Sequence, residues 1–203
     1  MRAFQCGCGQ RVFFDSTVCV RCGTDFGFDP ERLDMVPLQP GYQRCRNGLD
    51  YEASNWLLRA DALPGYCWSC GLSEVIPNLA VADNLALWNR LESAKRRLIY
   101  DLLSHGLPIG PGRRMPGLRF RFLEDRRRNP DVVEEVVTTG HQAGVITLNV
   151  AEADDVERTA AREQMQERYR TLLGHFRHER GHYSLNELVA DEASRARWRA
   201  LFG

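Results

Sequence analysis

Apolar residues recur at helical spacing in the middle of the chain and predict its longest regular element. From Asp83 onward they follow one another at intervals of three, four and seven residues, as on one face of an α-helix. Asp83 or Asn84 can cap the start of this helix, and Gly106 can end it. The apolar face consists of Leu87, Trp88, Leu91, Leu98 and Leu102.

The pattern changes to strict alternation after residue 117. Leu118, Phe120 and Phe122 alternate with arginines, which is typical of a half-buried strand. Farther on, the apolar stretches 132–137 and 144–150 flank the polar segment TTGHQA. This arrangement predicts a β-hairpin.

Three further helices are expected in the last quarter of the chain. One begins near Ala153, the second carries the histidines of segment 171–188, and the third runs from about Leu185 to Ala200. Strands and helices occur in separate stretches, which indicates an α+β fold with a small antiparallel sheet.

The cysteines divide the chain into a front and a back. All seven lie in the first 80 residues, whereas four of the five histidines lie beyond residue 140. Segments 29–43 and 75–84 are typical of connectors. We therefore predict a first module at 1–30, a second cysteine-containing module with a connector at 31–80, and a larger domain at 81–203 that is incomplete at its C-terminal end.

Composition and charge restrict the classes of partner. The chain has 27 basic and 27 acidic residues, so its net charge favours neither nucleic acid nor a membrane surface. It contains no apolar run of roughly 18 residues, the length that spans a bilayer, and its N-terminus lacks the apolar core of a signal peptide. We expect a cytoplasmic protein without a membrane partner; the sequence leaves the oligomeric state open.

An arginine-rich segment raises the question of nucleic-acid binding. Seven arginines lie between Arg113 and Arg128, with Phe120 and Phe122 among them. A nucleic-acid interface would use arginine for phosphates and phenylalanine for base stacking. The alternation instead favours phenylalanines in the core and arginines in solvent, balanced by nearby acidic residues. Nucleic acid is therefore not expected as a partner.

Four cysteines near the N-terminus have the spacing of a metal site. Cys6, Cys8, Cys19 and Cys22 form a CxC-x10-CxxC pattern, and a glycine follows the second cysteine of each pair. Glycine permits the tight turn in which backbone N–H groups face the sulfurs. In a reducing compartment this spacing favours metal over disulfides. The sequence predicts a structural zinc site with four thiolate ligands.

A second cysteine group is one ligand short. Cys67 and Cys70 form another CxxC pair, and Cys45 lies 22 residues before Cys67. A second structural zinc would need a histidine from elsewhere or a water as its fourth ligand. The alternative is that this group binds no metal.

His178, Glu179 and His182 spell HExxH, the motif that carries the chemistry of many zinc peptidases. Two histidines four residues apart lie on one face of a helix, where both imidazoles can bind one zinc ion. Zinc lowers the pKa of a bound water toward about 7. The glutamate can then act as general base toward that water. The alternative reading is a solvated helix face that happens to be rich in histidine.

Two other histidines are weaker candidates. His175 shares a helix face with the motif, but its distance of roughly 10.5 Å from His182 along a straight helix is too long for one shared ion. It is expected to pack or to support the ligands from behind, and packing is favoured. His141 falls in the predicted turn, where a structural role is favoured over a ligand.

A catalytic zinc also needs a third protein ligand. The metzincin motif would place a histidine at residue 188, where this chain has Leu188, so that class is excluded. The remaining downstream acids are Glu187, which lies close to His182, together with Asp191 and Glu192. None of the three is a clear ligand.

Taken together, these motifs resemble those of a bacterial family of zinc-binding metallopeptidases with an N-terminal zinc ribbon. The matching stretches are FQCGCGQRVFFDSTVCVRCG, GFDPERL, CWSCGLSEVIPNLA, LESAKRRLIYDLLSHGLPI, TTGHQAGVITLNVAEADDVER and YRTLLGHFRHERGHY. The resemblance implies zinc-ribbon modules followed by a zincin-like domain. Within that domain it implies His178 and His182 as zinc ligands, Glu179 as acid/base, and GVITLNV as an edge strand that pairs with an extended peptide.

The chain departs from the family in two places. A cysteine usually precedes the Asn-Trp pair that here follows Ser54, so the resemblance implies that Ser54 replaces a ligand of the second cysteine group. Family members also continue past residue 203, and the third catalytic ligand is expected there.

The leading hypothesis is a zinc-dependent metallopeptidase that hydrolyses a peptide or protein substrate. It would hold one catalytic zinc and one or two structural zincs. The alternative is a non-catalytic zinc-binding adaptor that contacts protein or nucleic acid through its ribbon.

Overall fold

The chain folds into an α+β structure, as predicted. The computed structural model describes residues 2–63, 65–110, 117–164, 166, 171–189 and 191–202. Its helices are α1 (Arg46–Tyr51), η1 (Cys70–Leu72), α2 (Asn84–Ser104), η2 (Val150–Ala153), α3 (Asp155–Gln164), α4 (Leu172–Leu188) and α5 (Glu192–Phe202).

Among the described residues, the strands form three small two-stranded sheets before α2 and one four-stranded sheet that includes the strands after it. The small sheets pair β1 with β2, β3 with β4 and β5 with β6, all antiparallel. The strands are β1 (Phe4–Gln5), β2 (Arg11–Val12), β3 (Phe26–Asp29), β4 (Asp34–Pro37), β5 (Tyr42–Arg44), β6 (Leu57–Arg59), β7 (Ser73–Val75), β8 (Arg119–Leu123), β9 (Gly140–Gln142) and β10 (Val145–Asn149).

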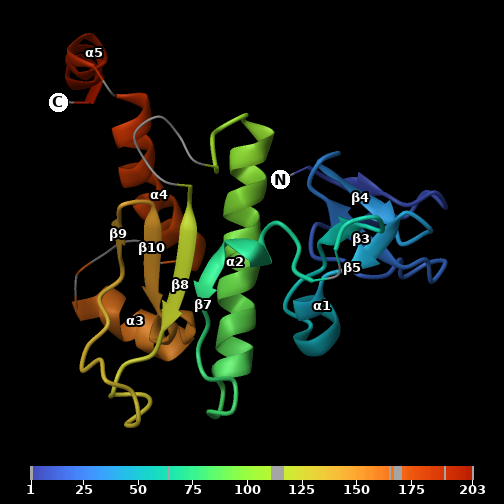
Figure 1. Ribbon diagram of the computed structural model, residues 1–203, viewed down its shortest axis with the longest axis horizontal. Coiled ribbons are helices and arrows are strands. Elements are labelled where there is room, and N and C mark those ends of the chain that lie inside the picture. Colours follow the sequence, from blue (N-terminus) through green and yellow to red (C-terminus); the bar gives the residue numbers. More distant parts are fainter. Residues whose placement is uncertain are drawn as a thin grey trace.

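The predicted central helix is confirmed as α2. Figure 1 shows it standing between the small sheets on one side and the four-stranded sheet on the other. The five apolar residues that predicted it are all buried. Gly106 has a φ of +64°, a conformation that glycine adopts at low cost, and the N–H of Leu107 bonds back to the carbonyl of Leu102. The helix therefore ends where the glycine predicts.

The cysteine-containing front, residues 2–81, packs on α2 through aromatic rings. Phe14 and Phe28 lie 5.1 and 5.6 Å from the ring of Tyr100, measured between centroids. Trp56 stacks in turn against Phe28 at 4.8 Å and is fully buried. Since each small sheet has strands of only two to four residues, this aromatic core and α2 supply packing that the strands cannot provide for themselves.

The larger sheet differs from the small antiparallel sheet that the sequence predicts. Its strand order is β7-β8-β10-β9, with β8 parallel to both β7 and β10 and only β9 antiparallel. Phe120, Phe122, Ile146 and Leu148 are fully buried on the face that packs against helices. The connection between β8 and β10 is long enough to bring the chain back to the end of the sheet at which β8 begins, as a parallel pair requires.

The predicted hairpin is wrong in its first arm, because the strand that pairs with β10 lies within the segment TTGHQA, which was expected to be the turn. Segment 132–137 contains no strand; Val133 and Val136 are 81% and 64% exposed, whereas Val137 is buried. The hairpin instead joins β9 to β10 through Ala143 and Gly144, which have φ values of +47° and +87°. Positive φ at both positions is typical of the tight turns that connect hairpin strands.

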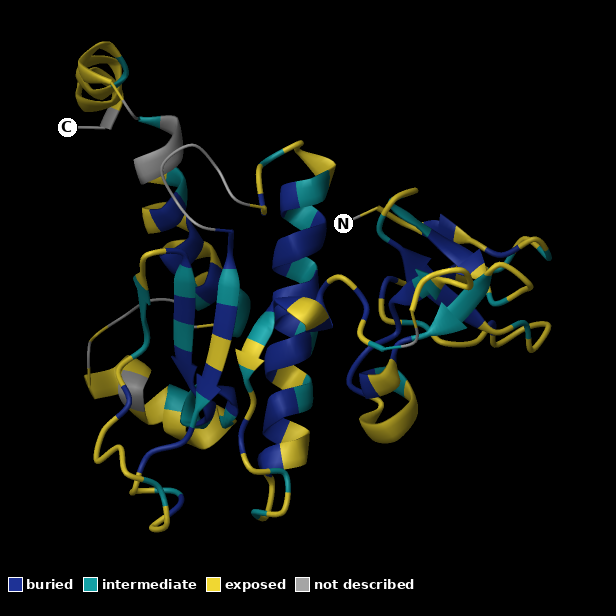
Figure 2. Cartoon of the chain, in the orientation of Figure 1, coloured by how far each residue is buried: buried dark blue, intermediate teal, exposed yellow. Residues whose placement is uncertain are grey.

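Helix α4 is anchored to the sheet by one aromatic side chain. Phe176 is fully buried, with its ring 5.7 Å from Phe120 and 6.1 Å from Phe122. The side chain of Thr171 caps the helix by accepting a hydrogen bond from the Gly174 N–H at 3.0 Å. The third predicted helix begins only at α5, and Figure 2 shows that α5 is mostly exposed.

The arginine-rich segment has the orientation that its alternation predicts. Phe120 and Phe122 lie in the core, whereas Arg121 is exposed and lies 3.6 Å from Glu74. The two phenylalanines are therefore not available to stack on bases. Arg113 and Arg114 lie outside the described residues.

Among the described residues, no helix has both the length and the apolarity that crossing a membrane requires. The division of the chain at residues 30 and 80 stays a prediction.

Replacing Phe176 with alanine should detach α4 from the sheet. We expect the free energy of unfolding to fall by about 3–5 kcal/mol, because the substitution leaves a cavity beside two other phenylalanines. Urea denaturation at constant zinc concentration measures this change. Phe13→Ala is the matched control, since Phe13 is 67% exposed and its loss should change stability by no more than about 0.5 kcal/mol. Equal effects of the two substitutions would contradict the anchoring role.

Candidate metal centres

The structure brings the four N-terminal cysteines together. All four sulfurs lie within 4.8 Å of one another. Cys6 Sγ is 3.5 Å from Cys22 Sγ, and Cys8 Sγ is 3.7 Å from Cys19 Sγ. A tetrahedral zinc with Zn–S bonds of about 2.3 Å separates its sulfurs by about 3.8 Å. The four thiols therefore fit one zinc ion.

Two turns present these thiols. The N–H of Gly9 bonds to the carbonyl of Cys6, and the N–H of Gly23 bonds to the carbonyl of Cys19, both at 2.9 Å. Both glycines have positive φ, +86° and +72°, which explains why the sequence has glycine after each pair. Hydrogen bonds from the hydroxyl and backbone N–H of Thr24 lower the pKa of Cys22 to about 6, which favours the thiolate form that binds metal.

The three remaining cysteines form a separate cluster, and their sulfurs also lie within 4.8 Å of one another. Cys45 precedes α1, Cys67 lies just before η1, and Cys70 is the first residue of η1. All three are buried. Hydrogen bonds from the thiols of Cys67 and Cys70 lower the pKa of Cys45, whereas burial raises the pKa of Cys67.

His178 and His182 meet on α4. Their Nε2 atoms are 3.2 Å apart, and the contact is exposed. Two imidazoles bound to a tetrahedral zinc at about 2.0–2.1 Å place their nitrogens about 3.3 Å apart. Glu179, the residue between them in the motif, is 8% exposed. The side chains of the HExxH motif are thus arranged so that one metal ion can reach both histidines.

His141 joins this region, although the sequence favoured a turn role for it. It lies on β9 opposite Ile146, so its ring points to the same face of the sheet as that buried residue. The ring lies 5.9 Å from Tyr183 of α4, and its Nε2 accepts a hydrogen bond from the Gly144 N–H at 3.0 Å. Burial lowers the pKa of His141, and the Glu179 carboxylate partly opposes this effect. The strand pairing is the feature that the turn interpretation missed.

A third ligand does not appear among the described side chains. No cysteine, histidine or carboxylate there joins the His178–His182 pair as a group within 4.8 Å. Asp191 accepts a hydrogen bond from the Ser194 N–H at 2.7 Å, and Glu192 pairs with Arg199 at 3.2 Å. The side chain of Glu187 lies outside the described residues.

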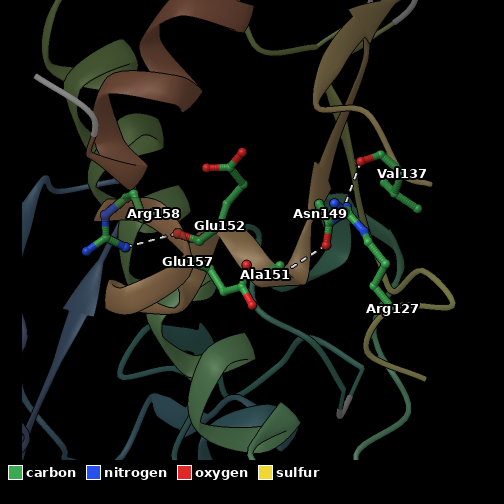
Figure 3. Close-up of a pocket in the computed structure, with 7 residues that line it drawn as sticks. All are labelled: Arg127, Val137, Asn149, Ala151, Glu152, Glu157 and Arg158. Atoms are coloured by element: carbon green, nitrogen blue, oxygen red, sulfur yellow. Dashed lines mark hydrogen bonds between the residues drawn. The ribbon is translucent and has the colours of Figure 1, made fainter. Parts of the chain in front are cut away.

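His175 turns away from the HExxH pair. Its Nε2 lies 3.6 Å from a carboxylate oxygen of Glu152 on η2. Glu152 borders a small polar cavity of about 120 Å³ between η2, α3 and the end of β10 (Figure 3). There Arg158 donates a hydrogen bond to the Glu152 carbonyl at 2.9 Å, and Asn149 donates one to the Val137 carbonyl at 3.1 Å. His175 therefore packs between elements, as favoured from its spacing.

The edge of the sheet beside α4 is β9. The stretch GVITLNV, for which the family resemblance implies an edge position, forms β10 and lies between β8 and β9. That expectation is wrong because residues 140–142 cover the free side of β10. A hollow of about 600 Å³ borders β9, and its walls include Arg121, Gln142 and Thr147. An extended chain could pair only with β9 on this side.

Comparisons with known proteins agree with the two kinds of site. Residues 84–203 match a family described as "Putative zinc-binding metallo-peptidase", and residues 3–81 match a family described as a zinc-ribbon domain. Uncharacterized proteins of Mycobacterium tuberculosis and Mycobacterium bovis are 44% identical over 209 residues. The match covers all of this chain but 59% of each relative. No solved structure matches the chain significantly.

Replacing Cys19 with alanine, which leaves no ligand atom at this position, tests the four-thiol site. We expect the variant to lose about one equivalent of zinc per chain, because a buried sulfur at a corner of the tetrahedron is removed. Zinc binding and folding are coupled in such modules, so hydrogen exchange in residues 3–37 should become faster. Elemental analysis gives the zinc content. Val20→Ser, which changes a residue that is 85% exposed, should keep the zinc; an unchanged zinc content in Cys19→Ala would exclude this site.

Proposed function

The chain belongs to the zinc-binding metallo-peptidase family, and from this premise we propose that it hydrolyses peptide bonds with a zinc-activated water. The observation that carries the proposal is the 3.2 Å separation of the His178 and His182 Nε2 atoms, with Glu179 beside them. This separation is close to that of two ligands on one tetrahedral zinc. A helix face that carried histidines for solubility alone would not need this convergence.

His178 and His182 would hold the catalytic zinc through Nε2, and Cys6, Cys8, Cys19 and Cys22 would hold a structural zinc. The catalytic ion, when bound, supplies a Lewis acid and lowers the pKa of a coordinated water toward about 7. The four-thiol site has no position left for substrate, which fits a structural role.

Glu179 would act as the general base. Its carboxylate oxygen can accept a proton from the attacking water and return that proton to the leaving amine. The side chain lies one residue from His178 on the same helix and is largely buried, so packing restricts its motion. Burial also strengthens electrostatic interactions with the reacting groups.

The substrate would be an extended peptide paired with β9. An edge strand offers unpaired backbone N–H and C=O groups that can bind a peptide main chain. β9 also carries His141, whose ring faces Tyr183 of the HExxH helix. A peptide on this strand would therefore run past the histidine pair.

The third zinc ligand is expected from beyond the described side chains. The chain spans 59% of the length of the curated relatives it matches, so the family protein has further residues that can supply it. Activity assays are therefore run on this chain and, in parallel, on one of the longer relatives.

A second candidate function is the non-catalytic adaptor. Residues 3–81, which match the zinc-ribbon family and are called the ribbon part below, contain a cavity of about 310 Å³. Its lining includes Tyr42, Tyr66 and Trp68. Tyr66 and Trp68 are 55% and 44% exposed, which is typical of side chains that contact partners. An absence of hydrolysis across a peptide library, with the histidine site fully loaded with zinc, would favour this function.

Glu179→Gln is the decisive substitution for peptidase activity. It removes the proton acceptor and keeps the shape of the side chain, so kcat should fall by about 10²–10⁴-fold while zinc stays bound. Fluorogenic peptide libraries measure the rate, and elemental analysis measures the zinc.

The control is Glu157→Gln, which changes an exposed glutamate on α3 and should leave both quantities unchanged. Hydrolysis that survives in Glu179→Gln at the wild-type rate would refute the proposed mechanism.

A further inference from the structure

The second cluster, Cys45, Cys67 and Cys70, has three sulfurs where a closed zinc site has four ligands. The three side chains are 0%, 1% and 4% exposed. Bulk water therefore has little access to the cluster. The candidates for a fourth ligand are therefore the protein groups that surround the sulfurs.

The hydroxyl of Ser54 occupies a suitable position. Its oxygen lies 3.4 Å from Cys67 Sγ. A tetrahedral zinc with one oxygen and three sulfur ligands separates the oxygen from each sulfur by about 3.5 Å. The Trp56 N–H donates to the same oxygen at 3.2 Å, which fixes the orientation of a side chain that is itself 7% exposed.

The backbone holds Ser54 against the start of α1, next to Cys45. The Ala53 N–H bonds to the Asn47 carbonyl at 2.9 Å. Gly48 approaches so closely that a Cβ atom added there would lie 2.1 Å from the Ser54 carbonyl oxygen. Glycine is therefore required at this position, and Ser54 is placed beside the cluster by the fold itself.

Glu92 is the other oxygen donor near the cluster, but its position is less suitable. One carboxylate oxygen lies 4.0 Å from Cys70 Sγ, yet the carboxylate does not join the three sulfurs as a group within 4.8 Å. The other oxygen accepts hydrogen bonds from Lys95 at 2.8 Å and from Ser73 at 3.0 Å. Glu92 therefore contacts Cys70 alone and is not placed to bind an ion held by all three sulfurs.

The charges on α2 fit an occupied cluster. Zinc with three thiolates and a neutral hydroxyl carries one net negative charge. Beside it, Lys95 and Arg96 are 0% and 6% exposed and carry two positive charges, whereas Glu92 carries one negative charge. Arg96 also donates a hydrogen bond to the Ala53 carbonyl, next to Ser54. Arg96 also pairs with Asp15 at 3.9 Å, so a zinc-bound cluster with one net negative charge is compatible with the surrounding charges.

From these contacts we propose that Cys45, Cys67 and Cys70 bind a second structural zinc with the Ser54 hydroxyl oxygen as its fourth ligand. A neutral hydroxyl is a weaker ligand for zinc than a thiolate. This zinc is therefore released more readily than the zinc of the four-thiol site. The proposal is independent of the peptidase function, because it concerns metal binding in the ribbon part alone.

The first experiment counts zinc in a variant without the histidine pair, His178→Ala/His182→Ala. Among the described residues, the two cysteine clusters are then the groups that can hold metal. We expect two zinc ions per chain, released to a chromogenic chelator in a fast and a slow phase of equal amplitude. One zinc per chain would overturn the proposal.

The second experiment changes the fourth ligand in the same background after substitution of zinc by Co²⁺. Ser54→Cys should raise the thiolate-to-cobalt absorption by about one seventh, because eight cysteines replace the seven present. In the zinc form it should also convert the fast release phase to a slow one. Ser104→Cys, which adds a thiol at an exposed position on α2, should change neither.

A third variant covers the case in which Ser54→Cys does not fold. Ser54→Ala removes the oxygen without adding bulk. We expect the zinc affinity of the second cluster, the site that releases zinc in the fast phase, to fall by at least roughly tenfold, which is the effect of losing a supporting partner of a metal ligand. Unchanged affinity in Ser54→Ala, or unchanged cobalt absorption in a folded Ser54→Cys, would show that Ser54 is not a ligand.

Discussion

Packing on two opposite sides of α2 is the constraint on which the rest of the structure depends. Tyr100 meets the aromatic core of the ribbon part, while Lys95 lies 5.6 Å from the ring centroids of both Phe120 and Phe122 in the sheet. Because both sides are covered, even charged residues of this helix are buried, and Lys95 is paired with Glu92 at 2.8 Å. One helix thus positions the cysteine clusters and the histidine helix relative to a common core.

The ribbon part shows how metal ligands can replace a large core. Its strands have two to four residues, and isolated sheets of this size are marginal in water. Two sets of cysteines tie its loops together, one beside β1 and β2 and one between α1 and η1. The second set touches α2 through Glu92, so metal binding there would also strengthen the contact between the two parts of the chain.

Helix α4 buries Phe176 on one side and exposes His178 and His182 on another. Phe176 fastens α4 to the sheet, and the contact between His178 and His182, two and six residues later, is open to solvent. β9 covers β10 and becomes the edge beside this helix, carrying His141 toward Tyr183. A rigid helix next to a free strand edge is an arrangement in which an extended peptide can be held and positioned for attack.

The sequence by itself determined α2, the alternating β8, both sets of cysteines and the HExxH motif, because each depends on local spacing. The periodicity of three to four residues defines the helix, and glycines after cysteines define the turns that present the sulfurs. Only the tertiary structure decided that the larger sheet is mixed, that β9 rather than β10 is its edge, and that His141 faces the histidine helix. It also decided that Glu92 approaches the second cluster, whereas the place of Ser54 beside that cluster agrees with what the family resemblance implies. These features join residues distant in sequence, and no local pattern records which strand or side chain fills the space beside another.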